Sequence, residues 1–144
     1  MRTPTIPQQL ETAQSLRSAG LFAEALEALA SPAEFNVDLC AMRGAIEFSL
    51  GRFEDAALSY SAVAISQPDS PDALHNLALC LQRSRRWDAA AEVYQRLLRL
   101  DSEQTNAREA RLGLGACLLE MQRAEEALEV FGQASTSAPP EPAL

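Results

Sequence analysis

The chain has 144 residues and a formal net charge of −8, from 12 basic and 20 acidic side chains, and 47% of its residues are apolar. This length suits one compact domain or one short repeat array, and the apolar share is sufficient to build a core. The acidic balance argues against nucleic acid and against an anionic membrane surface as partners.

Targeting and redox signals point to the cytoplasm. No stretch approaches the roughly 20 apolar residues of a membrane-spanning helix, and residues 1–10 hold no apolar run of signal-peptide type. The three cysteines form no CxxC pair and have no histidine at metal-ligand spacing. We therefore expect a cytoplasmic protein with three free thiols.

The first half of the chain predicts two helix pairs. Apolar residues at spacings of three and four predict a helix over 7–19, and Gly20 stands where that helix should stop. The same spacing predicts a helix over 37–50 that stops at Gly51, and a second helix follows each glycine. Ser31-Pro32 lies between the pairs and has the form of an N-cap followed by a first-turn proline.

The second half repeats this arrangement. Ser70-Pro71 again has the form of an N-cap and a first-turn proline, and it opens a helix predicted over 71–82. A further helix is predicted over 108–121, and each of the two is followed by a second helix. Because strict alternation of apolar and polar residues is nowhere sustained, no strand is predicted.

One alanine recurs in the second helix of every pair, at intervals of 31, 34 and 37 residues. These residues are Ala25, Ala56, Ala90 and Ala127. A large apolar residue follows four positions later in each case, namely Leu29, Tyr60, Tyr94 and Phe131. Since two helices approach to about 8 Å only where side chains are small, we expect the alanines to face Gly44, Ala78 and Gly115 of the first helices.

These residues resemble the tetratricopeptide repeat pattern, W-x2-L-G-x2-Y followed by A-x3-F and then P. The third unit matches best, with Leu77-Ala78, Trp87, Ala90 and Tyr94, whereas the first lacks the Leu-Gly pair and is a candidate cap. The resemblance implies an all-α, right-handed superhelical stack of about four antiparallel helix pairs. The expected organisation is a disordered N-terminus 1–6, repeats over 7–36, 37–70, 71–104 and 108–138, and a disordered Pro-rich tail 139–144.

A narrower resemblance concerns residues 111–131, RLGLGACLLEMQRAEEALEVF. This segment is similar to the third repeat of type III secretion translocator chaperones, which are cytosolic bacterial proteins. The two resemblances therefore imply two alternative functions. The first is a module that binds a peptide or helix of a partner protein, and the alternative is a dedicated chaperone of one secreted client.

In proteins of this type the first helices line a concave groove, which can hold a helix or an extended peptide. The expected groove residues are Met42, Ala45, Phe48, Asn76, Leu79, Arg83, Leu112 and Leu119. For Met42, Leu79 and Leu112, packing between first helices is an equally good interpretation. Asn76 can both donate to and accept from a peptide backbone, or it simply faces solvent. Arg83 belongs to a basic turn that is either solvated or in contact with an acidic partner.

No enzyme, cofactor or metal site is predicted. The chain has a single histidine, His75, no glycine-rich loop and no Ser-His constellation, so it lacks the groups that catalysis requires. The cysteines have apolar neighbours at helical spacing and are interpreted as small core residues.

The C-terminal end of the stack is a candidate for weak self-association. After Ala134 the sequence offers no further amphipathic helix, although a repeat array needs a polar cap at its end. Leu128 and Val130 have no predicted partner within the chain. We therefore expect a weak homodimer through the last helix.

Overall fold

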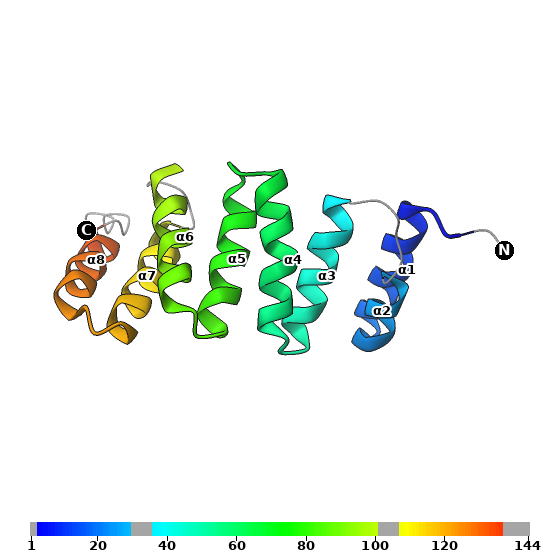
Figure 1. Cartoon of the computed structure of the whole chain (residues 1–144), viewed down its shortest axis with the longest axis horizontal. Coiled ribbons are helices and arrows are strands. Elements are labelled where there is room, and N and C mark those ends of the chain that lie inside the picture. Colours follow the sequence, from blue (N-terminus) through cyan, green and yellow to red (C-terminus); the bar gives the residue numbers. More distant parts are fainter. Residues whose placement is uncertain (1–2, 30–35, 101–106, 137–144) are drawn as a thin grey trace, which may run out of the picture. The chain divides into compact units, whose positions relative to one another are not determined.

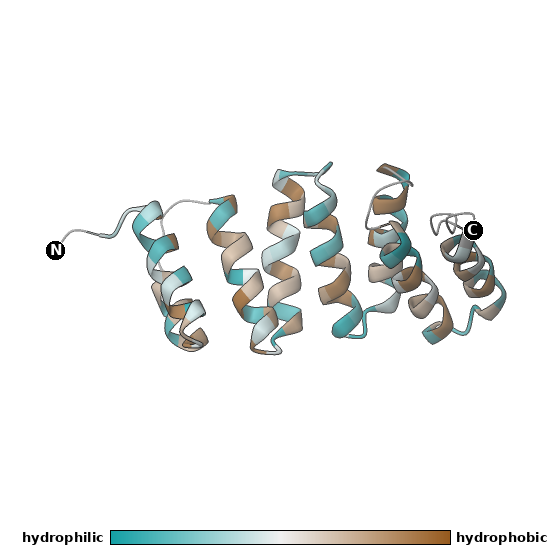
Figure 2. Cartoon of the chain, turned by 180° about the vertical axis from the view of Figure 1, so that it is seen from behind, coloured by the Kyte–Doolittle hydropathy of each residue, from teal (hydrophilic) through white to brown (hydrophobic). Residues whose placement is uncertain are grey.

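The computed structural model describes residues 3–29, 36–100 and 107–136, and in these ranges every regular element is a helix (Figure 1). This confirms the all-α expectation. The helices are α1 (Ile6–Ser18), α2 (Phe22–Ala28), α3 (Val37–Ser49), α4 (Phe53–Ser66), α5 (Pro71–Arg83), α6 (Trp87–Leu100), α7 (Ala107–Glu120) and α8 (Ala124–Thr136). Figure 2 shows hydrophobic and hydrophilic residues on the same helices, as expected of amphipathic helices.

The chain divides into two compact units, Met1–Pro68 and Asp69–Leu144. In the first unit α1 packs on α2, α3 packs on α4, and both α1 and α2 contact α3. In the second unit α5 packs on α6, α6 on α7 and α7 on α8, and the two first helices α5 and α7 also touch. Each unit therefore contains two helix pairs.

The two helices of every pair are joined by the same left-handed turn. Gly20 and Gly51 adopt φ of +79° and +76°, as the sequence predicted for helix ends. Arg85 and Gln122 occupy the equivalent positions with φ of 62° and 60°. In the first turn Leu21 N–H donates to the Leu16 carbonyl at 2.8 Å, and the other three turns have the same bond. The geometry is thus repeated even where a non-glycine residue is strained by it.

The helix starts show one confirmation and one correction. Ser70 caps α5 by accepting from Ala73 N–H at 3.3 Å, as predicted. At the N-terminus the expected disorder over 1–6 is wrong for Thr5 and Ile6, because Thr5 and Gln8 form a capping box that begins α1 at Ile6.

Three sequence-based expectations concern chain outside the described ranges. They are the disorder of residues 1–2, the proposed helix start at Ser31-Pro32, and the disordered tail 139–144. The described start of α3 uses a different residue, Asn36, whose side chain accepts from the N–H groups of Asp38 and Leu39.

Close helix contacts occur where the sequence places small residues. The four recurring alanines are completely buried. A Cβ added at Gly44 would lie 2.8 Å from the Tyr60 ring, and one at Gly115 would lie 2.4 Å from the Phe131 ring. Gly113, which the pattern did not single out, faces Tyr94 of the preceding pair equally closely, at 2.4 Å. Aromatic rings therefore fill the space that the glycines leave.

Candidate functional site

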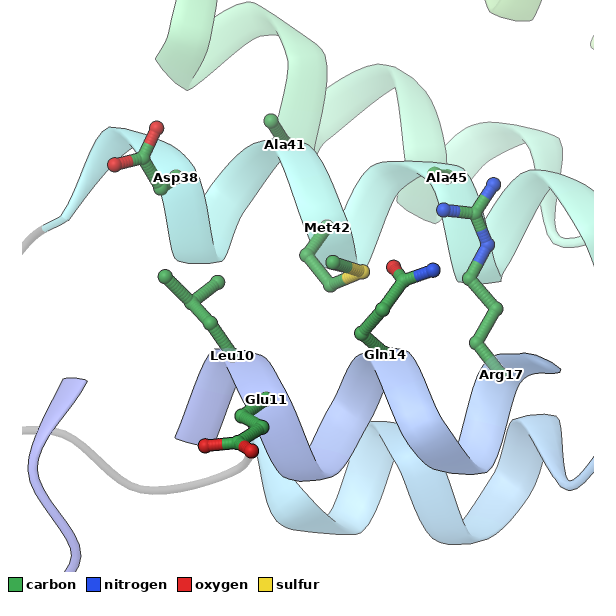
Figure 3. Close-up of a pocket in the computed structure, with 8 residues that line it drawn as sticks. All are labelled: Leu10, Glu11, Gln14, Arg17, Asp38, Ala41, Met42 and Ala45. Carbon is green, nitrogen blue, oxygen red and sulfur yellow. The ribbon is translucent and has the colours of Figure 1, made fainter. Parts of the chain in front are cut away.

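The first unit carries a groove of about 510 Å³ between its two first helices, α1 and α3 (Figure 3). Eight side chains line it: Leu10, Glu11, Gln14, Arg17, Asp38, Ala41, Met42 and Ala45. All eight lie on the described part of the first unit, so the groove belongs to that unit alone.

The spacing of the lining residues explains why they share one surface. On α1 the side chains of Leu10, Gln14 and Arg17 are four and three residues apart, which places them on one face of a helix. On α3, Ala41 and Ala45 are one turn apart and present only methyl groups. Because these two side chains are so small, the space between the helices is open.

Polar groups are distributed unevenly along this groove. Figure 3 shows Glu11 and Asp38 toward one end with Leu10, and Arg17 beside Ala45 at the other. Both carboxylates are exposed and the guanidinium is partly buried. Within the described ranges none of these three side chains forms an ion pair. The groove thus has an acidic end, a middle that holds Met42 and the Gln14 amide, and a basic end.

Two of the predicted groove residues lie in this site. Met42 and Ala45 both line it, and Met42 also packs on the core cluster that contains Leu39 and Ile46. One part of the Met42 side chain therefore lines the groove, and another part packs on the core.

Phe48 was predicted for the same surface but is not among the eight lining residues. Its ring lies edge-on to that of Phe53, with centroids 5.1 Å apart, and the two rings pack α3 against the start of α4. A substitution at Phe48 would therefore disturb this contact between helices as well as the surface.

Sequence reasoning missed the contribution of α1, including Leu10, Glu11 and Gln14. The first repeat has no Leu-Gly pair, so its register was not evident from the motif. The interval of 31 residues that relates Ala25 to Ala56 also relates Ala13 to Gly44, and both of the latter are buried. Extending that interval to α1 would have identified its groove positions.

The second unit presents a separate apolar surface on its own first helices. Leu112 and Leu119 on α7 are 43% and 50% exposed, and they are seven residues apart on one face. Leu112 is therefore a surface residue, whereas Leu79 on α5 is half-buried. Of the remaining predicted residues on α5, Asn76 is half-buried and Arg83 is exposed.

Buried polar chemistry in the second unit centres on Tyr94. Its hydroxyl donates to Gln82 Oε1 at 2.7 Å, and burial raises the pKa of Tyr94 to about 12. Burial likewise raises the pKa of the Cys117 thiol to about 11. Both groups are therefore protonated near neutral pH. Cys80 and Cys117 are buried, as expected of core residues, whereas Cys40 is only half-buried.

The first unit contains a buried carboxylate that the sequence analysis did not single out. Glu47 is 8% exposed and accepts a hydrogen bond from Ser59 Oγ at 2.5 Å. Burial raises the pKa of Glu47 despite that bond. One turn earlier, Arg43 donates to the Leu29 carbonyl at the end of α2, at 2.7 Å. Both side chains occupy positions where α5 carries the buried Leu77 and Leu81.

Leu128 and Val130 of α8, the two residues proposed for self-association, differ in exposure. Leu128 is 71% exposed, although the equivalent residue of α6, Ala91, is buried where α6 packs on α7. Val130 is half-buried. Leu128 thus stands at the position that a following helix would cover.

Membrane-spanning helices and metal-binding clusters are both absent from the described residues. No helix in these ranges has the length and hydropathy needed to cross a membrane. The same ranges contain no group of three or more His, Cys, Asp or Glu side chains that could hold a metal ion. The groove between α1 and α3 and the exposed leucines of α7 are the candidate binding surfaces described above.

Comparison with known proteins agrees with this architecture. Among solved structures, the chain is similar to MamA AMB-1, with a TM-score of 0.82 and 20% identity over 93% of this chain and 79% of that one. It is also similar to the MamA D159K mutant, with a TM-score of 0.85 and 20% identity over 96% and 78% of the two chains. A third, MamA 41-end from Desulfovibrio magneticus RS-1, has a TM-score of 0.76 and 18% identity over 91% and 74%. At these identities the likeness concerns the fold alone.

At the level of sequence, the chain matches the model of one protein family. No curated protein matches the chain. The tetratricopeptide repeat model matches residues 42–105 and 83–142, which together span more than half of the chain. This protein therefore belongs to the tetratricopeptide repeat family, whose fold is that of an interaction module for other proteins.

Proposed function

We propose that this protein binds a peptide or a helix of a partner protein in the groove between α1 and α3. The observation that supports this most directly is the open groove of about 510 Å³, to which Leu10, Met42 and two alanines contribute apolar surface. A groove lined by apolar side chains and a few polar ones suits a segment with apolar anchors. The exposed surface of Leu112 and Leu119 in the second unit is a further candidate contact for the same partner.

The proposal places the protein in the cytoplasm, acting as a scaffold without a cofactor or a catalytic role. The three free thiols and the acidic charge support this setting. The alternative, a dedicated chaperone of a secreted client, is not favoured, because the family match supports protein binding in general and gives no reason to prefer that narrower role. A weak homodimer through Leu128 is proposed separately and does not involve the groove.

The test uses the full chain and a random dodecapeptide library displayed on phage. Ala41→Gln with Ala45→Gln fills the groove with two long uncharged side chains, and glutamine preserves the helix because its propensity is high. The matched control is Leu58→Gln with Ile65→Gln, two exposed residues of α4 that do not line the groove.

Peptides selected on the natural protein are expected to lose at least about tenfold in affinity for the groove-filled variant, which corresponds to about 1.4 kcal/mol. Their affinity for the control variant should be unchanged. Circular dichroism of all three proteins should show equal helix content. Equal binding to the groove-filled variant, or no selected peptide at all, would contradict the proposal.

A further inference from the structure

The groove between α1 and α3 has charges of opposite sign at its two ends. Glu11 and Asp38 come from different helices and lie toward the same end, on opposite sides of Leu10, and Arg17 is at the other end (Figure 3). Ala41, Met42 and the Gln14 amide lie between the two ends. The groove therefore combines residues of two helices, α1 and α3; Glu11 and Asp38, for example, are 27 residues apart in the sequence.

The three charges are available to a ligand. In the described ranges they form no ion pair with each other or with other side chains, and both carboxylates are exposed. A charge at the rim of a binding surface contributes to orientation and specificity when its counterpart is supplied by the partner. The single amide in the groove, Gln14, can both donate to and accept from a ligand's main chain.

We propose that the occupant of the groove is a protein segment with a basic side chain and an acidic side chain on either side of an apolar one. Its basic side chain lies against Glu11 and Asp38, its apolar side chain contacts Leu10 and Met42, and its acidic side chain lies against Arg17. This inference rests on the proposed groove function and specifies the chemistry of the partner. A uniformly acidic or uniformly basic segment would meet repulsion at one end.

Helix geometry sets the spacing between the ligand's two charges. Glu11 and Arg17 are six residues apart on α1, which corresponds to about 9 Å along the helix axis. An extended segment rises about 3.3 Å per residue and points alternate side chains to the same face, so two charges that flank an apolar side chain on that face should be four residues apart and span about 13 Å. On a helical ligand, charges about seven residues apart lie on one face and span about 10 Å.

The experiment repeats the dodecapeptide selection on three proteins: the natural chain, Glu11→Gln with Asp38→Asn, and Arg17→Gln. All three changes remove charge; the two carboxylate changes keep the size of the side chain, whereas Arg17→Gln also shortens it. Peptides selected on the natural chain are expected to combine one basic and one acidic residue at either spacing with an apolar residue between them. The first variant should lose only the basic preference, and the second should lose only the acidic one.

Affinities provide a quantitative check. A peptide selected on the natural chain should bind the Glu11→Gln, Asp38→Asn variant about three- to tenfold more weakly, as expected for two exposed ion pairs. That difference should shrink in 0.5 M salt, because screening acts on exposed charges. An uncharged analogue of the peptide should bind both proteins equally.

Two results would overturn the inference. One is a pool from the natural chain without a charge preference, and the other is an unchanged basic preference on the doubly neutralised variant. If those peptides still lose affinity for the groove-filled variant, the proposed function stands and only the ligand chemistry is wrong. If no selected peptide depends on the groove, both proposals fail.

Discussion

A methyl group added at Gly113 tests whether the contact between α6 and α7 depends on a missing side chain. In Gly113→Ala the new Cβ would lie 2.4 Å from the Tyr94 ring, where ordinary carbon contacts are about 3.5–4.0 Å. The ring would have to move by about 1 Å. It is held in place because Tyr94 is only 2% exposed and its hydroxyl donates to Gln82.

The expected change in stability is a balance of three contributions. Overpacking a well-filled contact costs about 1–3 kcal/mol, and weakening the bond between Tyr94 and Gln82 costs about 0.5–1.5 kcal/mol. Replacing a helical glycine by alanine returns about 1 kcal/mol. We therefore predict that Gly113→Ala lowers the free energy of unfolding by about 1–3 kcal/mol.

Urea unfolding measures this change, followed by circular dichroism and by the fluorescence of Trp87, the only tryptophan of the chain, which begins α6. The matched control is Gly132→Ala on α8, where a Cβ would meet no atom within 4 Å. That variant should gain about 0.5–1 kcal/mol. If Gly113→Ala is as stable as the natural chain, the Tyr94 ring yields freely and the close-packing argument is refuted.

Four further predictions concern single side chains. Since burial raises the pKa of Glu47, ionisation of this carboxyl group disfavours folding as pH rises. The Glu47→Gln variant still accepts a hydrogen bond from Ser59, so it should be more stable than the natural chain at pH 8 but not at pH 4. An equal difference in stability at both pH values would contradict this. Arg85→Gly should raise the free energy of unfolding by about 0.5–1 kcal/mol in urea, because it removes side-chain strain at φ of 62°; a loss would show that the turn is unstrained. Sedimentation should detect a concentration-dependent dimer that Leu128→Glu weakens, whereas a strict monomer at high micromolar concentration would exclude it. Cys117 should react with a thiol reagent only when the protein is unfolded, and the mass of the native protein should show no disulfide bond. Rapid labelling of Cys117 in the folded protein at pH 8 would refute its burial.

The alternation of helices and turns was predictable because it depends on local features. Apolar spacing, the caps and the two glycines act within a few residues, and a pattern repeated four times reinforces itself. The alanine and glycine positions were also predictable, since only small side chains allow helices to approach closely. Arg85 and Gln122 were not recognised as turn residues, because a left-handed conformation leaves a clear signal only when glycine supplies it.

The sequence alone therefore determined the family, the helix pairs and the small residues that join them, because each of these depends on neighbours along the chain. The repeat interval could have assigned Leu10, Glu11 and Gln14 to the same helix face as Ala41, Met42 and Ala45. Only the tertiary structure decided that the space between α1 and α3 is an open groove, since the two helices belong to different repeats and meet only when they pack. It also decided that Phe48 packs on Phe53 while Leu112 faces solvent. Which face of an amphipathic helix is left uncovered depends on the partner that packs against it, and that partner is distant in sequence.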